Sequence, residues 1–193
     1  MKATTRMATR TLAFCALLAA LSVVLARLIV PMPNAFTRFS IEAVPIFLAG
    51  LLFGPVAGGM VGFTADLVGC LFSGYGYNPL FCVPPSLYGV IAGVFRYFVA
   101  GKQRLFWLIV SFVFATLVGS IAYQSCALAY VYYYEPSVEN SFRQGLIYFL
   151  STRAVQFAVT AVIDIAIVYL LLQLKIFDRM RLWPVSKKSK KRF

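Results

Sequence analysis

Residues 53–85 read FGPVAGGMVGFTADLVGCLFSGYGYNPLFCVPP, and the fold is best approached from this stretch. An apolar run ends at Phe53, Gly54 and Pro55 interrupt it, and a second apolar run continues to Phe72. Proline cannot continue the hydrogen bonds of a preceding helix, and glycine tolerates a tight turn. The pattern therefore predicts two helices joined by a short hairpin.

The composition of the whole chain places these helices in a membrane. Of its 193 residues 61% are apolar and 12% are charged, and the mean hydropathy is +0.83. A soluble globule has more polar surface than this, and a helix needs about 20 apolar residues to cross the hydrocarbon layer. The sequence predicts an all-α membrane protein, a bundle of six transmembrane helices with a short second helix. The predicted spans are 8–29, 41–52, 55–72, 83–100, 105–132 and 146–174.

Basic residues gather on one side of this predicted bundle. They precede the first span, join the fourth to the fifth and follow the sixth. Six crossings bring these three groups to the same side, which the positive-inside rule assigns to the cytoplasm. Both termini are therefore predicted to lie on the cytoplasmic side of a cell membrane. The net charge of +12 then reflects orientation and contact with anionic lipid, and no nucleic-acid partner is expected.

The chain is predicted to form one transmembrane domain over residues 1–182, followed by a basic cytoplasmic tail at 183–193. No linker or charge run divides the six spans. The first span has the basic start and small residues of a cleaved signal peptide, but its apolar run is longer than usual, so we expect it to stay in place.

The cysteines and the absence of histidine argue against a metal site. Cys15, Cys70, Cys82 and Cys126 include no close pair, which excludes a zinc ribbon or a redox dithiol and leaves apolar filling as their expected role. Only Cys70 and Cys82 are placed to meet near the outer face. Without histidine, histidine-ligated metals and histidine-based hydrolysis are also excluded. No cofactor is expected.

Asp66 is the one acidic residue inside the predicted third span. A carboxylate near the middle of a bilayer costs roughly 2.5 to 3.5 kcal/mol on insertion scales, so it usually faces a partner or a ligand. Gly58, Gly62 and Asp66 recur at four-residue spacing and share one helix face, and small residues let helices pack closely. We expect Asp66 to point into the bundle, where it either binds a ligand or pairs with a structural arginine.

The predicted sixth span carries a polar stripe. Arg153, Gln156, Thr160 and Asp164 follow at spacings of three, four and four residues, which places them along one side of a helix. At about 1.5 Å of rise per residue, Arg153 and Asp66 reach similar depths and can meet. Asp164 falls nearer the cytoplasmic interface, where we expect a hydrated or locally paired carboxylate and not a ligand contact.

Further candidates come from the fifth span and from the outer loops. Thr116, Ser120 and Gln124 share one face at four-residue spacing, although hydroxyls in such helices often bond back to their own carbonyls. Of these three, Gln124 is the candidate. The aromatic and polar side chains of the outer loops form either an interfacial belt or a lid over a ligand. The loop candidates are Phe36, Arg38, Tyr75, Tyr77, Asn78 and Phe81.

A pocket with aromatic walls, one acid, several arginines and amides suits a flat polar heterocycle that carries acidic groups. The chain has no Gly-x-x-x-x-Gly-Lys phosphate loop and no nucleophile and base at motif spacing. It is therefore not expected to be an enzyme, and any ATP hydrolysis belongs to another subunit. An autonomous proton-coupled carrier that uses Asp66 and Arg153 as a relay is an alternative.

The chain resembles the substrate-binding S components of energy-coupling factor (ECF) vitamin transporters, most closely the folate-specific ones. The resemblance rests on Ala16-x-x-x-Ala20 and on three further motifs. These are RFSIEAVPI at 38–46, LAGLLFGP at 48–55, and ADLVG at 65–69 before the Gly-Tyr loop.

The resemblance implies a six-helix bundle that captures a vitamin from the outer side. The similarity to the folate-specific members implies that this vitamin is folate. The bundle then docks on a transmembrane scaffold subunit driven by two cytoplasmic ATPases, and Ala16 and Ala20 meet the scaffold. Asp66 would bind the pterin edge, Tyr75, Tyr77 or Phe36 would stack on it, and Arg38 or Arg153 would hold carboxylates. A queuosine precursor, thiamin or riboflavin is the alternative cargo.

Overall fold

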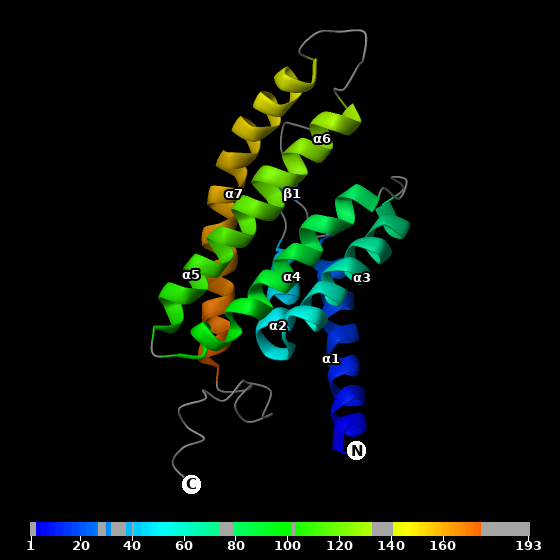
Figure 1. The fold of residues 1–193 in the computed structure, drawn as a ribbon, viewed down its shortest axis with the longest axis vertical. Coiled ribbons are helices and arrows are strands. Elements are labelled where there is room, and N and C mark those ends of the chain that lie inside the picture. Colours follow the sequence, from blue (N-terminus) through cyan, green and yellow to red (C-terminus); the bar gives the residue numbers. More distant parts are fainter. Residues whose placement is uncertain are drawn as a thin grey trace.

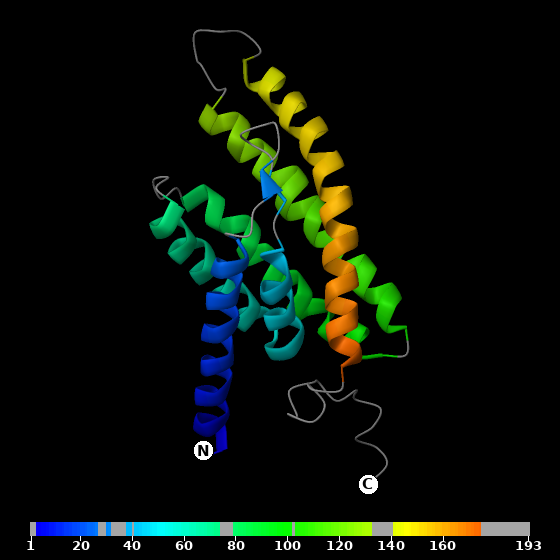
Figure 2. The ribbon, with the colours of Figure 1, turned by 180° about the vertical axis from the view of Figure 1, so that it is seen from behind.

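The computed structural model describes residues 3–26, 30–31, 38–39, 41–73, 79–101, 103–132 and 141–174, which form an elongated bundle of helices (Figure 1). In chain order the elements are α1 (Ala3–Leu25), β1 (Val30–Pro31), β2 (Arg38–Phe39), α2 (Ala43–Phe53), α3 (Pro55–Ser73), α4 (Pro79–Val99), α5 (Arg104–Ala115), the π-helix η1 (Thr116–Tyr123), α6 (Gln124–Tyr132) and α7 (Ser141–Gln173). The start of α1 and the end of α7 lie at the same end of the molecule (Figures 1 and 2).

Within the part of the chain that the structure describes, four helical stretches are long and apolar enough to cross a membrane, so the chain is a multi-pass membrane protein. They are Pro55–Phe72, Pro79–Val99, Arg104–Tyr132 and Phe142–Gln173. The apolar part of α1, Thr9–Leu25, and α2 are shorter. The all-helical membrane class is thus confirmed, whereas the count of six crossings and the cytoplasmic side of the termini stay predictions.

The predicted hairpin between the second and third helices is confirmed. α2 ends at Phe53, α3 begins at Pro55, and Gly54 between them has φ of 104°, a left-handed conformation that glycine adopts without strain. Pro55 occupies the first position of α3, where a missing N–H costs nothing.

The short helix α2 forms the centre of the bundle. Every residue from Val44 to Leu52 is buried, as expected for a helix that is apolar all round. The ring of Phe47 lies 4.7 Å from that of Phe112 in α5, measured between centroids. Phe112 in turn packs edge-on against Tyr88 of α4 at 5.8 Å. The main core therefore surrounds α2, with side chains from α1, α3, α4, α5 and α7.

Glycines allow α3 and α4 to approach until their backbones touch. A Cβ at Gly58 would overlap the carbonyl oxygen of Gly89, and a Cβ at Gly62 would overlap that of Pro85. Gly58 and Gly62 therefore do share one packed face, as their spacing predicts. Asp66, one turn further along α3, lies on this same face.

The structure corrects the predicted starts of two helices. α4 begins at Pro79 and not at residue 83, and Pro84 and Pro85 lie inside this helix. α7 begins at Ser141 and not at residue 146. The outer segment after α1 contains a two-residue antiparallel pairing, Val30 with Phe39 and Pro31 with Arg38, which the sequence did not predict.

Candidate functional site

Asp66 receives hydrogen bonds from thiols on two helices. The Sγ atom of Cys82 in α4 lies 2.8 Å from Asp66 Oδ2, and the Sγ atom of Cys70, one turn along α3, lies 3.9 Å from the same oxygen. Cys82 is buried, whereas Asp66 and Cys70 are half-buried. Asp66 thus faces α4, as predicted. The two thiols meet through the carboxylate, so apolar filling does not describe their role.

Phe81 lies in the first turn of α4 and not in a loop, because the helix begins earlier than predicted. It is half-buried and packs against a small apolar cluster of Leu128, Ala129 and Phe149, which belong to α6 and α7. Phe81 therefore connects the end of α4 that carries Cys82 to the α6 and α7 side of the bundle.

The predicted polar stripe on α7 faces the interior. Arg153 and Gln156 are each 7% exposed, Thr160 is 9% exposed, and Asp164 is 4% exposed. The Arg153 guanidinium lies 5.7 Å from the centre of the Phe157 ring. Thr160 donates a hydrogen bond back to the carbonyl oxygen of Gln156 at 3.1 Å. One face of α7 is therefore polar and closed to lipid.

Of the two alternatives predicted for Asp164, a hydrated or a locally paired carboxylate, the hydrated one is wrong. Asp164 is buried, and its Oδ1 atom has no hydrogen-bond partner among the described residues. The spacing of four residues from Thr160 keeps both side chains on the same inward face of α7. That face continues into the core, so depth along the helix does not bring Asp164 to water.

Two hydroxyl residues of η1, Thr116 and Ser120, contact Tyr88 of α4, and sequence reasoning missed these contacts. The Tyr88 hydroxyl donates to Thr116 Oγ1 at 3.2 Å and lies 2.9 Å from Ser120 Oγ. Thr116 also bonds back to the carbonyl oxygen of Phe112 at 2.9 Å, the alternative expected for a hydroxyl in an apolar helix. This network ties α4 to the π-helix.

The π-helix changes which residues of this helix face inward. After Ser120 the next fully buried polar side chain is Ser125, five residues later, while Gln124 is only half-buried. A π-turn accommodates one extra residue, which shifts the following face by one position. Four-residue spacing therefore does not carry Gln124 onto the row of Thr116 and Ser120, and its role as a ligand contact stays a prediction.

Several predicted loop residues lie outside the described residues, namely Phe36, Tyr75, Tyr77 and Asn78. Arg38 is described through the backbone of β2, which contacts α7. Strand β2 is thereby placed beside the helix that carries Arg153 and Gln156. In Figures 1 and 2, α4 lies between α3, the helix of Asp66, and α7, the helix of Arg153.

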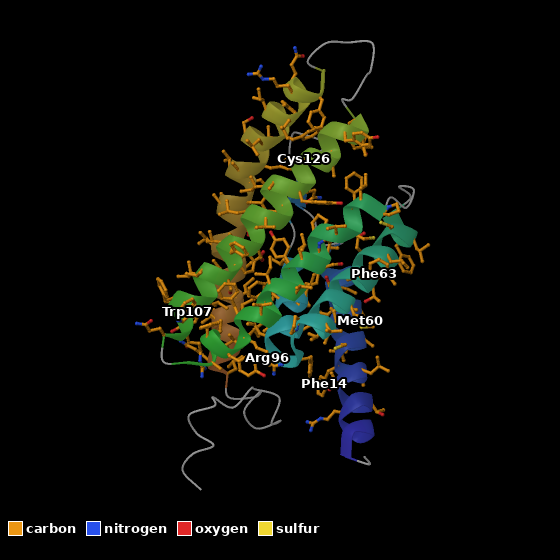
Figure 3. All side chains as sticks on the ribbon, in the orientation of Figure 1. Phe14, Met60, Phe63, Arg96, Trp107 and Cys126 are labelled. Carbon is orange, nitrogen blue, oxygen red and sulfur yellow. The ribbon has the colours of Figure 1, made fainter. Side chains whose placement is uncertain are left out.

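A concavity of about 490 Å³ lies at the other end of the bundle. Its lining residues are Gln103, Arg104, Leu105, Phe106 and Tyr169. Nearby, the ring of Trp107 packs against Phe98 at 4.8 Å, and Figure 3 shows Trp107 at this end of α5. Aromatic and basic side chains at the end of a bundle are typical of a membrane interface. None of these residues was predicted to bind the ligand.

The arrangement can recognise a polar molecule but offers little for covalent chemistry. It presents an acid on α3, Asp66, which accepts hydrogen bonds from two thiols. It also presents a buried cation and an amide on α7, Arg153 and Gln156. Among the described residues, no group of three or more cysteine, aspartate or glutamate side chains is placed to hold a metal ion. Cys82 and Tyr88 were missed because their partners lie on other helices, and no spacing within one helix reveals such contacts.

Comparison with known proteins agrees with this description. Residues 10–172 match the family described as "ECF transporter, substrate-specific component". UPF0397 proteins of two Streptococcus pneumoniae strains, CGSP14 and ATCC 700669 / Spain 23F-1, are each 26% identical over 133 residues, which are 67% of this chain and 73% of the relative. The crystal structure of FolT bound with folic acid superposes with a TM-score of 0.67 at 25% identity, over 84% of this chain and 92% of FolT.

Proposed function

Because this chain belongs to the family of substrate-specific components of ECF transporters, we propose that it is the folate-binding subunit of such a transporter. It captures folate at the outer face of the bacterial cytoplasmic membrane and delivers it through a scaffold subunit and two ATPases. The observation that carries the proposal is the likeness to folate-bound FolT over 84% of the chain. A subunit of this family binds a substrate and is not itself catalytic.

The residues described above supply the groups that folate requires. Asp66 accepts hydrogen bonds from the amino edge of the pterin, as a carboxylate does in charge-assisted pairing. Arg38 or Arg153 binds the glutamate carboxylates, and Gln156 lies one turn from Arg153 on the same buried face. Burial strengthens such contacts, because water competes less for the charged groups.

The aromatic candidates complete this proposed site from the loops. Stacking by Phe36, Tyr75 or Tyr77 covers the flat pterin ring, Asn78 and Gln124 add amide groups, and Phe81 forms part of the wall. Aromatic faces provide a large contact area for a planar heterocycle. Phe81 supports this arrangement, since it joins α4 to the apolar cluster of α6 and α7.

Helix α1 provides the proposed docking face for the scaffold. Ala16 and Ala20 are both exposed and one turn apart, so they offer a shallow surface that another helix can approach closely. In this proposal the chain crosses the membrane six times with both termini in the cytoplasm. The start of α1 and the end of α7 lie at the same end of the molecule, which supports placing both termini on one side of the membrane.

The proposal is tested by measuring folate binding to the purified chain by isothermal titration calorimetry. Asp66→Asn removes the charge that attracts the pterin edge, so the affinity should fall at least about tenfold. Asp164→Asn is the matched control, because Asp164 is also an acid within a predicted membrane span but has no assigned ligand contact. It should bind folate like the wild type.

Two results would count against the proposal. If Asp66→Asn binds folate as tightly as the wild type while remaining folded, Asp66 does not belong to the site. If the wild-type chain does not bind folate, and mass spectrometry of the purified protein identifies another retained vitamin, the subunit serves that cargo instead.

A further inference from the structure

We propose that Cys82 is a positioning residue for the substrate, one that fixes the orientation of the Asp66 carboxylate by donating its thiol hydrogen to it. This inference rests on the proposed function of Asp66 as the acid that binds the ligand. It assigns a contribution to ligand affinity to a buried cysteine for which the sequence predicted only apolar filling.

The contact geometry carries the first step. Cys82 is 2% exposed, and its Sγ atom lies 2.8 Å from Asp66 Oδ2. The Cys70 thiol approaches the same oxygen at 3.9 Å. Rotation about the last side-chain torsion of aspartate is broad and meets only weak intrinsic barriers. A donor fixed on one oxygen therefore sets the plane of the carboxylate.

A carboxylate held in this way can still bind a ligand. Each of its oxygens accepts hydrogen bonds at two positions, giving about four acceptor sites in total. A thiol is a weak donor and carries no charge. It can therefore orient Asp66 without compensating its negative charge, whereas a lysine or arginine donor would compensate it. Asp66 thus keeps its negative charge for the donors of the ligand.

The backbone around Cys82 holds the thiol rigidly. One turn further into the bundle, Gly62 of α3 lies in backbone contact with Pro85 of α4. The Ser86 hydroxyl donates to the carbonyl oxygen of Cys82 at 2.8 Å, within the turn interrupted by the two prolines. The two helices therefore cannot slide, and the thiol is presented to Asp66 from a fixed position. Orientation before binding reduces the entropy that the ligand must overcome.

The experiment measures folate affinity by calorimetry in the full-length protein. Cys82→Ala removes the donor and should weaken binding about threefold to tenfold. Cys82→Ser keeps a hydroxyl donor at the same place and should restore most of the affinity. Cys126→Ala is the matched control, since Cys126 is exposed on α6 (Figure 3), and it should bind like the wild type.

A double-mutant cycle separates positioning from general packing. If Cys82 acts through Asp66, adding Cys82→Ala to Asp66→Ala, which leaves no acceptor for the thiol, should cause no further loss of affinity. A full additional loss, or a Cys82→Ser variant as weak as Cys82→Ala at equal thermal stability, overturns the inference.

The infrared S–H stretching band gives a readout that needs no ligand. The band of Cys82 is identified as the one that is missing from the spectrum of Cys82→Ala. In Asp66→Asn this band should shift, because the thiol then has a neutral acceptor in place of a charged one. An unshifted band overturns the thiol contact itself. If the wild-type chain does not bind folate, the proposed function fails whatever the band does. If it binds folate but Asp66→Asn binds as tightly, Asp66 does not belong to the site and the inference about Cys82 fails with it. If Asp66→Asn does weaken binding but Cys82→Ala does not, only the inference about Cys82 fails.

Discussion

Gly58 in α3 and Gly89 in α4 face each other so closely that the carbonyl oxygen of each occupies the place where a Cβ on the other would stand. Gly50 of α2 reaches the same point, since a Cβ at Gly58 would lie only 2.6 Å from its Cα atom. Three helices therefore meet at one position without side chains between them. This contact fixes the relative height of α3 and α4, and with it the register that places Cys82 opposite Asp66.

The first prediction concerns this glycine contact. Gly58→Ala forces α3 and α4 apart and should destabilise the fold by about 1–3 kcal/mol, the usual cost of overpacking. Thermal unfolding of the purified protein in detergent measures the effect. Gly69→Ala on the same helix is the control, because its Cβ would meet no atom within 4 Å. Equal melting temperatures for the two variants would contradict the close packing.

The second prediction tests the link between α4 and the π-helix. Tyr88→Phe keeps the ring against Phe112 but loses the hydrogen bonds to Thr116 and Ser120. The free energy of unfolding should fall by about 1 kcal/mol, the net value of a typical buried hydrogen bond. Thermal unfolding again provides the measurement. Tyr97→Phe removes a hydroxyl from an exposed tyrosine and should leave the melting temperature unchanged; a similar loss there would show that the network is not responsible.

The sequence predicted the helices well where a local residue dictates the backbone. Gly54 and Pro55 placed the α2–α3 hairpin to within one residue, because their backbone preferences act on the chain directly. The start of α4 was predicted at residue 83, four residues later than its observed start at Pro79, which occupies the first helical position that proline favours. The π-helix at Thr116–Tyr123 was not predicted, because no residue type in this segment favours a π-helix specifically. It contains Ser120, which contacts Tyr88 on another helix.

The candidate site was predicted only as far as single helices allow. Four-residue spacing correctly placed Asp66 on the packed face of α3, and three-residue spacing correctly placed Arg153 and Gln156 on one buried face of α7. The partners across helices depend on the vertical register of two helices, which no spacing within either one encodes. Cys82 therefore appeared as apolar filling until the glycine contacts of α3 and α4 were known.

The third prediction concerns the end of α2. Arg96 of α4 donates from Nη2 to the carbonyl oxygen of Leu52 at 3.1 Å, and Figure 3 shows it beside α2. The last carbonyls of a helix have no partner within the helix, and a cation there also interacts favourably with the helix dipole. Arg96→Gln should lower the free energy of unfolding by about 1.5 kcal/mol, as measured by thermal unfolding. Arg143→Gln, at an exposed arginine of α7, is the control and should have no effect.

The last prediction separates docking from ligand binding. Ala16 and Ala20 are exposed on α1, away from the residues assigned to the ligand. Ala16→Trp fills the shallow face that a partner helix would approach, so it should abolish close contact with the scaffold subunit. Folate binding to the purified subunit should stay at the wild-type level, whereas folate uptake by cells that carry the complete transporter should be lost. Val162→Trp introduces the same ring at an exposed position of α7 and should leave uptake intact. Normal uptake with Ala16→Trp would remove α1 from the docking interface, while equal loss in both variants would point to a general defect of the altered membrane surface.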